Sequence, residues 1–344
     1  MATATRPSIA DSVLKKALLK EYGESIFHHS FKPTGYIPTG IPTLDYALGR
    51  PGYACGRVTV IRGDPSTGKS SLLHKAIAET QRLGGTAVLL ETEDAIDLDR
   101  MAQLGVDIDK LSPLIFQPDT VETTLNLMSK VIEVVRQEAP DDLVLIGWDS
   151  VAATPTQREI DGEVGDASYG AHSRLISQAM RMLTRKISSH RICVIIVNQS
   201  KTKATTMPFQ DPTTMIADRP LFFHATALLD VKRTGKEKAK GEDPTGINMG
   251  ITVNKNKLAA PYRVADVDLS FTQGFDIPGS WLELGEKVGV LKKNGAWYTW
   301  NDQKFQARDW PNILMSTDVV DKIREVAFPP FEDTETHPVV LESV

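Results

Sequence analysis

The chain contains few of the residues that mark extracellular or metal-dependent proteins. It has only two cysteines, Cys55 and Cys193, in 344 residues, and their spacing is typical of neither a metal site nor a disulfide framework. None of the seven histidines has a neighbour pattern that indicates metal binding or proton transfer. We therefore expect both cysteines in the core of a protein from a reducing compartment, and a cytoplasmic location.

Long apolar runs and an excess of positive charge are also missing. No stretch approaches the roughly 20 consecutive apolar residues of a membrane-spanning helix, and residues 1–10 lack the apolar stretch of a secretion signal. The formal net charge is −5 at pH 7, so any surface for nucleic acid must be a local one. These absences predict no membrane partner.

What the sequence does contain is a phosphate-binding loop between a strand and a helix. Residues 63–70 have the spacing G-x-x-x-x-G-K-[ST], and strand-like and helical patterns precede and follow them. In this setting backbone N–H groups face the phosphates, Lys69 adds positive charge at the β and γ groups, and Ser70 is a ligand for Mg²⁺. The residues predicted to bind a nucleoside triphosphate are Gly63, Asp64, Pro65, Ser66, Thr67, Gly68, Lys69, Ser70 and Ser71.

Carboxylates follow two further apolar strands. Asp149 ends the strand-like run 143–148 and is expected to help hold Mg²⁺. The run 86–90 leads into an acidic turn, in which Glu93 is a candidate for orienting the attacking water. A strand-ending cap for Asp149 and a solvated acidic turn around Glu93 are the plainer alternatives.

Strands and helices alternate from about residue 40 to residue 230. This order predicts an α/β fold with a mostly parallel sheet covered by helices on both faces. The strand 193–197 belongs to the same sheet and is followed by Gln199, whose amide is a candidate sensor of the γ-phosphate. Simple termination of that strand is the alternative.

The remaining segments divide the chain into parts. A short amphipathic helix is predicted after an N-cap at Ser12, and we assign 1–36 to this helix and a linker. A single helix cannot bury its own apolar stripe, so it packs either on its own domain or on a neighbouring subunit. The ATPase core is assigned to 37–270, and 271–328 to a small C-terminal part with an Asn-Gly hairpin and a helix. The acidic stretch 329–344 is predicted to be a disordered tail.

Local positive charge gathers in three stretches that could contact a polyanion. One face of a predicted helix carries Arg174, Ser177, Gln178 and Arg181. A long aperiodic stretch, 200–220, carries lysines and an arginine, and a basic turn covers 232–240. Each stretch could equally be a solvated surface.

Together these segments resemble the bacterial RecA recombinase family, including the shorter recombinases of phages. The resemblance runs from about Ser8 to Trp300. Besides the phosphate loop, it is carried most clearly by Leu44–Gly49, Glu159–Asp166, Ser177–Arg181, Asn198–Gln199 and Lys255–Pro261. It implies a P-loop NTPase fold of RecA type, with an N-terminal oligomerisation helix and a small C-terminal extension.

The resemblance also implies roles at the nucleotide. Glu93 matches the catalytic glutamate of the family, Gln199 its γ-phosphate sensor, and Asp97 an acid beside the nucleotide. Lys255 and Lys257 match lysines that reach the phosphates of a neighbouring subunit, much as an arginine finger does. Hydrolysis is therefore expected to depend on filament assembly.

Two segments, 159–170 and 200–220, match the DNA-binding loops of the family. Tyr169 and Phe209 are expected to wedge against bases. Lys232 and Arg233 match a second DNA site that captures duplex or the displaced strand. The DNA-binding residues predicted in this way are Tyr169, Arg174, Ser177, Arg181, Lys203, Phe209, Arg219, Lys232 and Arg233.

The chain departs from the family pattern at several positions, among them Phe222 and Leu228, which replace basic residues, and two further departures concern the predicted binding sites. Arg100 stands where the family usually has an aromatic residue against adenine, although a guanidinium can also stack. Ala217 and Asp218 replace a Gly-Gly pair, and we expect Asp218 to repel phosphate, with Arg219 as the offset.

The leading hypothesis is an ATP-dependent recombinase that forms a filament on single-stranded DNA and pairs it with homologous duplex DNA. ATP and Mg²⁺ are the expected cofactors, and single-strand-binding and loader proteins are possible partners. A ring-forming helicase of the same core fold is one alternative. A non-hydrolysing, ATP-switched DNA-coating or mediator protein is the other.

Overall fold

A computed structural model describes residues 9–23, 32–162, 170–202, 213–237, 243–316 and 318–329. The chain divides into two compact units, Met1–Pro33 and Thr34–Val344. The first unit contains helix α1 (Ile9–Tyr22), on which the side chains of Val13 and Leu14 are exposed. The predicted helix is therefore present, but Ser12 as its N-cap is wrong, because the helix already begins at Ile9.

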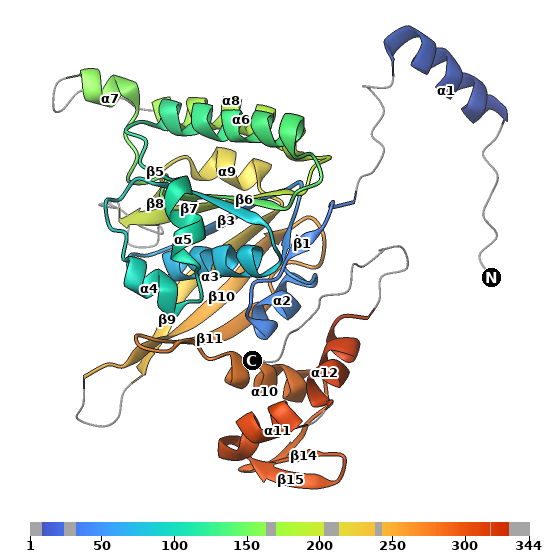
Figure 1. The fold of residues 1–344 in the computed structure, drawn as a ribbon, viewed down its shortest axis with the longest axis vertical. Helices are drawn as coiled ribbons and strands as arrows, with labels where there is room; N and C mark the ends of the chain where they lie inside the picture. The colour runs from blue at the N-terminus through green and yellow to red at the C-terminus, as the bar shows by residue number, and fades with distance from the viewer. Residues whose placement is uncertain are drawn as a thin grey trace, which may run out of the picture. The chain divides into compact units, whose positions relative to one another are not determined.

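A ten-stranded sheet forms the centre of the second unit. Its strands are β3 (Val58–Gly63), β4 (Thr86–Glu91), β5 (Ile115–Phe116), β6 (Val144–Asp149), β7 (Ile192–Thr202), β8 (Thr213–Met215), β9 (Ala227–Glu237), β10 (Gly246–Asn256), β11 (Val264–Ser270) and β12 (Gly274–Phe275). Their order is β12-β11-β10-β9-β3-β7-β6-β4-β5, with β8 paired to β7 (Figure 1). The strands from β9 to β5 are parallel, whereas β10, β11 and β12 join antiparallel.

Helices cover both faces of this sheet. One face carries α2 (Pro42–Leu48), α3 (Lys69–Arg82), α4 (Leu98–Gln103) and α5 (Ile108–Leu111). The other carries α6 (Val121–Glu138), α8 (Ala171–Ile187) and α9 (Asp218–His224). The short helix α7 (Gln157–Asp161) follows β6, and a two-stranded ribbon pairs β1 (Tyr36–Ile37) with β2 (Tyr53–Ala54). The predicted mostly parallel α/β sheet is confirmed.

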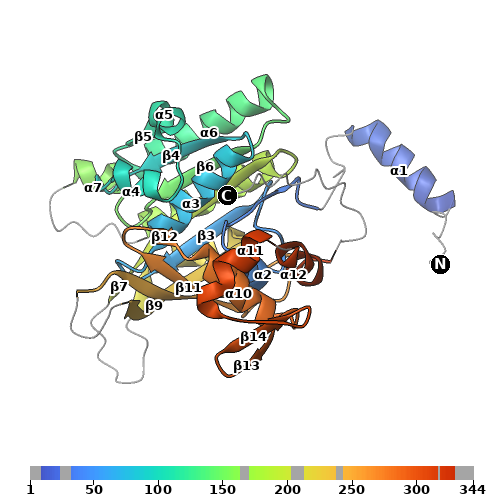
Figure 2. The same ribbon diagram turned by 60° about the horizontal axis from the view of Figure 1, so that its bottom comes forward.

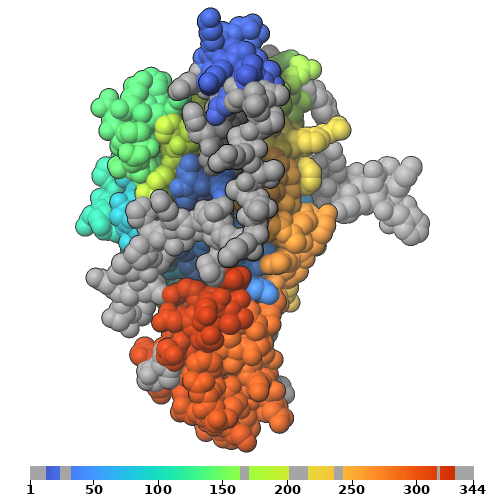
Figure 3. Space-filling view, turned by 90° about the vertical axis from the view of Figure 1, so that its right-hand side faces the viewer, coloured from blue at the N-terminus to red at the C-terminus, as the bar shows by residue number. Residues whose placement is uncertain are grey.

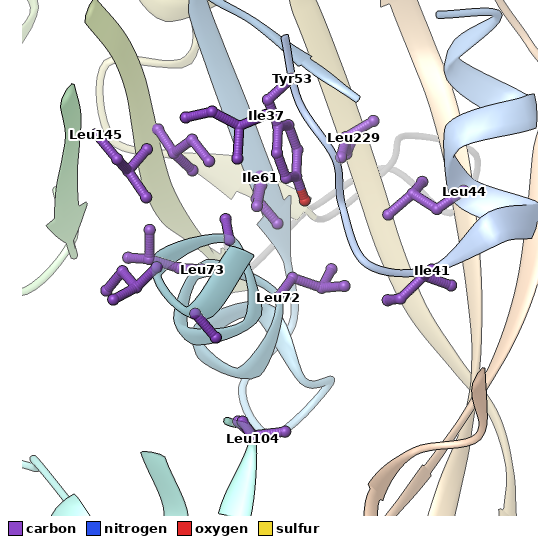
Figure 4. Packing of buried hydrophobic residues seen from close by; sticks show 14 of the residues in the cluster. Ile37, Ile41, Leu44, Tyr53, Ile61, Leu72, Leu73, Leu104, Leu145 and Leu229 are labelled. Atoms are coloured by element: carbon purple, nitrogen blue, oxygen red, sulfur yellow. The ribbon is translucent and has the colours of Figure 1, made fainter. Parts of the chain in front are cut away.

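Alternation along the strands explains the two covered faces. In β7, Cys193 and Ile195 belong to one core cluster, whereas Val194 and Ile196 belong to the other, because successive strand side chains point to opposite faces. Figure 4 shows Leu72 and Leu73 of α3 packed beside the sheet in the first cluster. Both cysteines are free and buried, as predicted.

The C-terminal residues form a separate hydrophobic cluster. It consists of three helices and a three-stranded antiparallel sheet. The helices are α10 (Ile277–Lys287), α11 (Trp310–Ser316) and α12 (Val319–Ala327), and the strands are β13 (Lys292–Asn294), β14 (Trp297–Trp300) and β15 (Gln303–Gln306). This group comes forward in Figure 2, and its orange-to-red residues lie together in Figure 3. The predicted hairpin with its turn at Gly295 and the helix after it are both present.

Two further predictions from the sequence concern the acidic tail and membrane-spanning helices. The predicted acidic tail, 329–344, lies outside them apart from Pro329. Among the described residues, no helix combines the length and the apolar character needed to cross a bilayer.

Candidate functional site

The phosphate loop connects β3 to α3, as the sequence predicts. Gly63 has φ 154°, and a Cβ there would lie 2.1 Å from the carbonyl oxygen of Val231. Gly68 has φ 89°, and a Cβ there would lie 2.7 Å from Sδ of Met249. Only glycine fits both positions without strain. The N-cap residue of α3, Gly68, has no side chain that could cap the helix, so the first N–H groups of α3 are suited to bind an anion.

A buried lysine and a buried carboxylate lie beside this loop. Lys69 is 5% exposed, burial lowers its pKa, and its Nζ donates to the carbonyl oxygen of Asp64 at 2.6 Å. Asp149 is 6% exposed, and burial raises the pKa of its carboxyl group to about 6.

The Asp149 carboxylate has an unused oxygen. Ser70 hydrogen-bonds to Asp149, but Oδ1 of Asp149 has no hydrogen-bond partner among the described residues. A buried polar atom without a partner is costly, and carboxylate and hydroxyl oxygens are ligands that Mg²⁺ accepts. The two predicted metal residues therefore fit that ion.

Glu93 and Gln199 meet at the same edge of the sheet. The Glu93 carboxylate accepts hydrogen bonds from Oγ of Ser150 and from Nε2 of Gln199. They meet because β4, β6 and β7 are parallel neighbours, so their carboxyl ends lie side by side. Glu91 fixes the turn, because its carboxylate accepts the backbone N–H of Glu93 at 2.9 Å. Ser150, which directly follows Asp149, has no role predicted from the sequence.

Asp97 and Arg100 lie at the start of α4. Oδ1 of Asp97 accepts the backbone N–H of Arg100 at 2.9 Å and so caps the helix. The Arg100 guanidinium donates to the carbonyl oxygens of Phe271 at 2.8 Å and Ser270 at 3.0 Å. These contacts fix the plane of the guanidinium beside the end of β11.

Lys255 and Lys257 contact the end of α9 rather than the phosphate loop. Nζ of Lys255 donates to the carbonyl oxygens of Phe222 and Phe223, the latter at 3.1 Å. Nζ of Lys257 donates to the same Phe223 oxygen at 3.3 Å. Burial and the neighbouring Lys257 lower the pKa of Lys255.

Strand register shows why these lysines cannot serve the loop of their own chain. Asn256 pairs with Ala227 at the start of β9, whereas Gly63 pairs with Val231 farther along β9. Because β9 and β3 are parallel, β10 ends at the edge of the sheet opposite the phosphate loop. Within one subunit the predicted catalytic residues are thus split between two edges.

Predicted DNA-binding side chains line a groove between α8 and α9. The groove has a volume of about 480 Å³. Its lining residues are Ser173, Arg174, Ser177, Gln178, Arg181, Arg219, Pro220 and Phe223. Three of the predicted arginines therefore converge with Ser177, to which Nη1 of Arg181 donates at 3.4 Å.

The other predicted DNA residues lie elsewhere. Lys232 and Arg233 are exposed on β9. Tyr169, Lys203 and Phe209 fall outside the described residues.

Asp218 has a partner that the sequence analysis did not foresee. Its Oδ1 accepts a hydrogen bond from Nη1 of Arg62 at 2.6 Å. Arg219, the residue named as a possible offset to Asp218, lines the groove, and its effect on phosphate stays a prediction.

The sequence of this chain is also similar to a known protein family. A family model described as "RecA N-terminal domain" matches residues 13–276. The chain belongs to the RecA family. The RecA-type fold and family expected from the sequence are confirmed.

Relatives of this RecA-family chain are similar over most of their length. "Protein RecA" of Bacteroides thetaiotaomicron is 38% identical over 314 residues, covering 91% of this chain and 90% of the relative. "Protein RecA" of Synechococcus sp. (strain CC9902) is 42% identical over 274 residues, 79% of this chain and 70% of the relative. "Protein RecA" of Brevibacillus brevis is 38% identical over 294 residues, which cover 83% of this chain and 81% of the relative.

Proposed function

We propose that this protein is a DNA-dependent ATPase that assembles into a filament on single-stranded DNA and catalyses homologous pairing and strand exchange with duplex DNA. Membership of the RecA family supports this function. The observation that carries it is the meeting of the phosphate loop, Glu93 and Gln199 at one sheet edge, beside the segment that leads to the arginine groove. Location in the cytoplasm and interaction with single-strand-binding and loader proteins belong to the same proposal.

ATP is the proposed substrate of the phosphate loop. The N–H groups of the loop and of the uncapped α3 terminus bind phosphate oxygens, and Lys69 contributes a buried positive charge. Ser70 and Asp149 hold Mg²⁺, which neutralises phosphate charge when bound. Asp97 and Arg100 lie on the nucleotide side of α4 and orient the base.

Glu93 is the proposed base that orients the attacking water. Its carboxylate is held in place by two donors, Ser150 and Gln199, which restrict where a water can be accepted. Gln199 directly precedes the segment 200–220, so a phosphate that competes for its amide alters both Glu93 and that segment. This is how ATP binding is communicated to the DNA-binding side.

Lys255 and Lys257 supply positive charge to the phosphates of the next subunit. Their position at the edge opposite Gly63 supports a site shared between subunits. The exposed apolar side chains of α1, Val13 and Leu14, support docking of this helix on a neighbouring subunit.

The groove between α8 and α9 is the proposed contact with the single strand. Its arginines and Ser177 can donate to phosphate oxygens. Lys232 and Arg233 are proposed to bind the second DNA. Tyr169, Lys203 and Phe209 complete the primary DNA site, and the two aromatic side chains interrupt base stacking.

The decisive experiment measures ATP hydrolysis without DNA, with single-stranded DNA and with duplex DNA, each at low and moderate salt. Stimulation by single strands that weakens with salt and accompanies filaments in negative-stain images is the expected result. Turnover that ignores DNA, or closed rings, would indicate a helicase-type motor. DNA binding with no turnover would indicate a switch protein.

A further inference from the structure

Two side chains flank Gly63 and reach opposite ends of the segment 200–220. Arg62, directly before Gly63, donates to Asp218 at 2.6 Å. Asp64, directly after Gly63, accepts a hydrogen bond from Oγ of Ser200. The phosphate loop therefore contacts the residues that begin and nearly end this segment.

The two ends of the segment are also held to each other. Ser200 pairs with Met215 in the short β7–β8 ladder, and Nδ2 of Asn198 donates to the carbonyl oxygen of Ile216 at 2.9 Å. Asp218 is the first residue of α9. We call these paired ends, 198–200 and 215–218, the neck of the segment. Both contacts to the phosphate loop thus act on this neck.

Arg62 is well placed to hold such a contact rigidly. Its side chain is 14% exposed, and it also bonds to both carboxylate oxygens of Asp230, one of them at 3.2 Å. Asp230 in turn accepts from Nδ2 of Asn254 at 2.5 Å. Charge-assisted bonds to a half-buried guanidinium are stronger and more directional than neutral ones. Asp218, with 42% of its side chain exposed, is the partner that solvent can reach.

We propose that Arg62 and Asp64 are positioning residues that couple the phosphate loop to the DNA-binding segment through Asp218 and Ser200. DNA that orders the neck of the segment shifts these two contacts and with them the loop around Gly63. ATP bound in the loop acts on the neck in the reverse direction, since coupling between two sites is reciprocal. The inference rests on the proposed function, because it needs both ligands to bind.

The test uses Asp218→Asn, Ser200→Ala and their combination in the full-length protein. The dissociation constant of a fluorescent ATP analogue with Mg²⁺ is measured with and without a saturating oligo(dT), and the ratio of the two constants is the coupling factor. Glu325→Gln, which removes the carboxylate paired with Lys322 at 2.7 Å, and Ser188→Ala, which removes an exposed hydroxyl, are the matched controls.

Each test variant is expected to reduce the coupling factor about 3- to 10-fold, as for loss of one hydrogen bond with a charged group. The dissociation constant of the ATP analogue without DNA and the melting temperature should stay close to the wild-type values. This result separates a loss of coupling from a structural effect. A coupling factor within about twofold of wild type in both single variants would overturn the inference alone. A wild-type protein whose ATP affinity ignores DNA would overturn the proposed function together with it.

Discussion

Among single residues, Glu93 is the side chain whose proposed role is tested most directly by one substitution. Glu93→Gln keeps an oxygen that can accept from Ser150 but removes the charge that accepts a proton from water. We expect ATP hydrolysis to fall at least about 100-fold, while ATP binding and DNA-dependent assembly remain.

Steady-state hydrolysis and fluorescent-nucleotide binding measure the two effects separately. Glu138→Gln, at an exposed position of α6, is the control and should behave as wild type. Normal turnover in Glu93→Gln would refute the assignment of this residue.

Asp45 should make stability depend on pH. Burial raises the pKa of its carboxyl group to about 7, although its Oδ1 accepts the backbone N–H of Thr39 at 2.9 Å. The folded state therefore holds a proton that the unfolded chain, with a pKa of about 3.9, has already lost. The stabilisation from this proton is complete at low pH and disappears as the pH rises through about 7.

Asp45→Asn removes this dependence. The melting temperature of Asp45→Asn minus that of wild type should increase by a few degrees from pH 5 to pH 8. Thermal unfolding without ligands measures this difference. A constant difference between the two proteins across that range would argue against a raised pKa.

Among the elements, α8 carries both an arginine that lines the groove and an arginine that does not. Arg181 lines the groove, whereas Arg185 on the same helix is exposed and lies outside the groove lining. Arg181→Ala should weaken single-strand binding about 3- to 10-fold and lower the salt slope by about one charge. Arg185→Ala should change both much less. Fluorescence anisotropy over a salt series provides the measurement, and equal effects would exclude the groove as the phosphate contact.

The C-terminal cluster depends on a short aromatic stack. Phe305 lies between Tyr298 and Trp310, with ring centroids 5.8 Å and 5.7 Å away. Phe305→Ala should lower the free energy of unfolding of this cluster by about 3 to 5 kcal/mol. Unfolding in urea, monitored by tryptophan fluorescence, measures this loss. Trp297→Ala, whose side chain is 47% exposed, should cost far less. Equal losses would show that the stack is not the core of this group.

Elements could be predicted well because their signals are local. The apolar run 193–197 indicated a strand, the alternation of strands with helices along the chain indicated two covered faces, and parallel order predicted Glu93 and Gln199 at one edge. The partner of Asp218 could not be predicted in this way, because Arg62 is 156 positions distant and contact depends on how β3 meets α9. The hydrogen bonds of Lys255 with the end of α9 were missed for the same reason.

At the scale of the whole molecule, the split of catalytic residues between two sheet edges predicts complementation. Glu93→Gln and Lys257→Ala should each be nearly inactive alone. In an equal mixture, about a quarter of head-to-tail contacts join an intact Glu93 to an intact Lys257. We therefore expect about a quarter of wild-type DNA-stimulated turnover to return. Absence of recovery in mixtures that still assemble would mean that the lysines do not act on a neighbouring subunit.

The opposite placement of β10's end and the phosphate loop gives every subunit a direction. If the site is shared between subunits as proposed, a row of such subunits has one fewer complete site than it has members, with lysines that face no neighbour at one terminus and an unassisted loop at the other. On the same proposal a solitary subunit has no complete site, and turnover per subunit is expected to rise with row length toward a plateau. ATP consumption therefore reports the length of the row, and the two termini, being chemically different, are expected to grow and shorten at different rates.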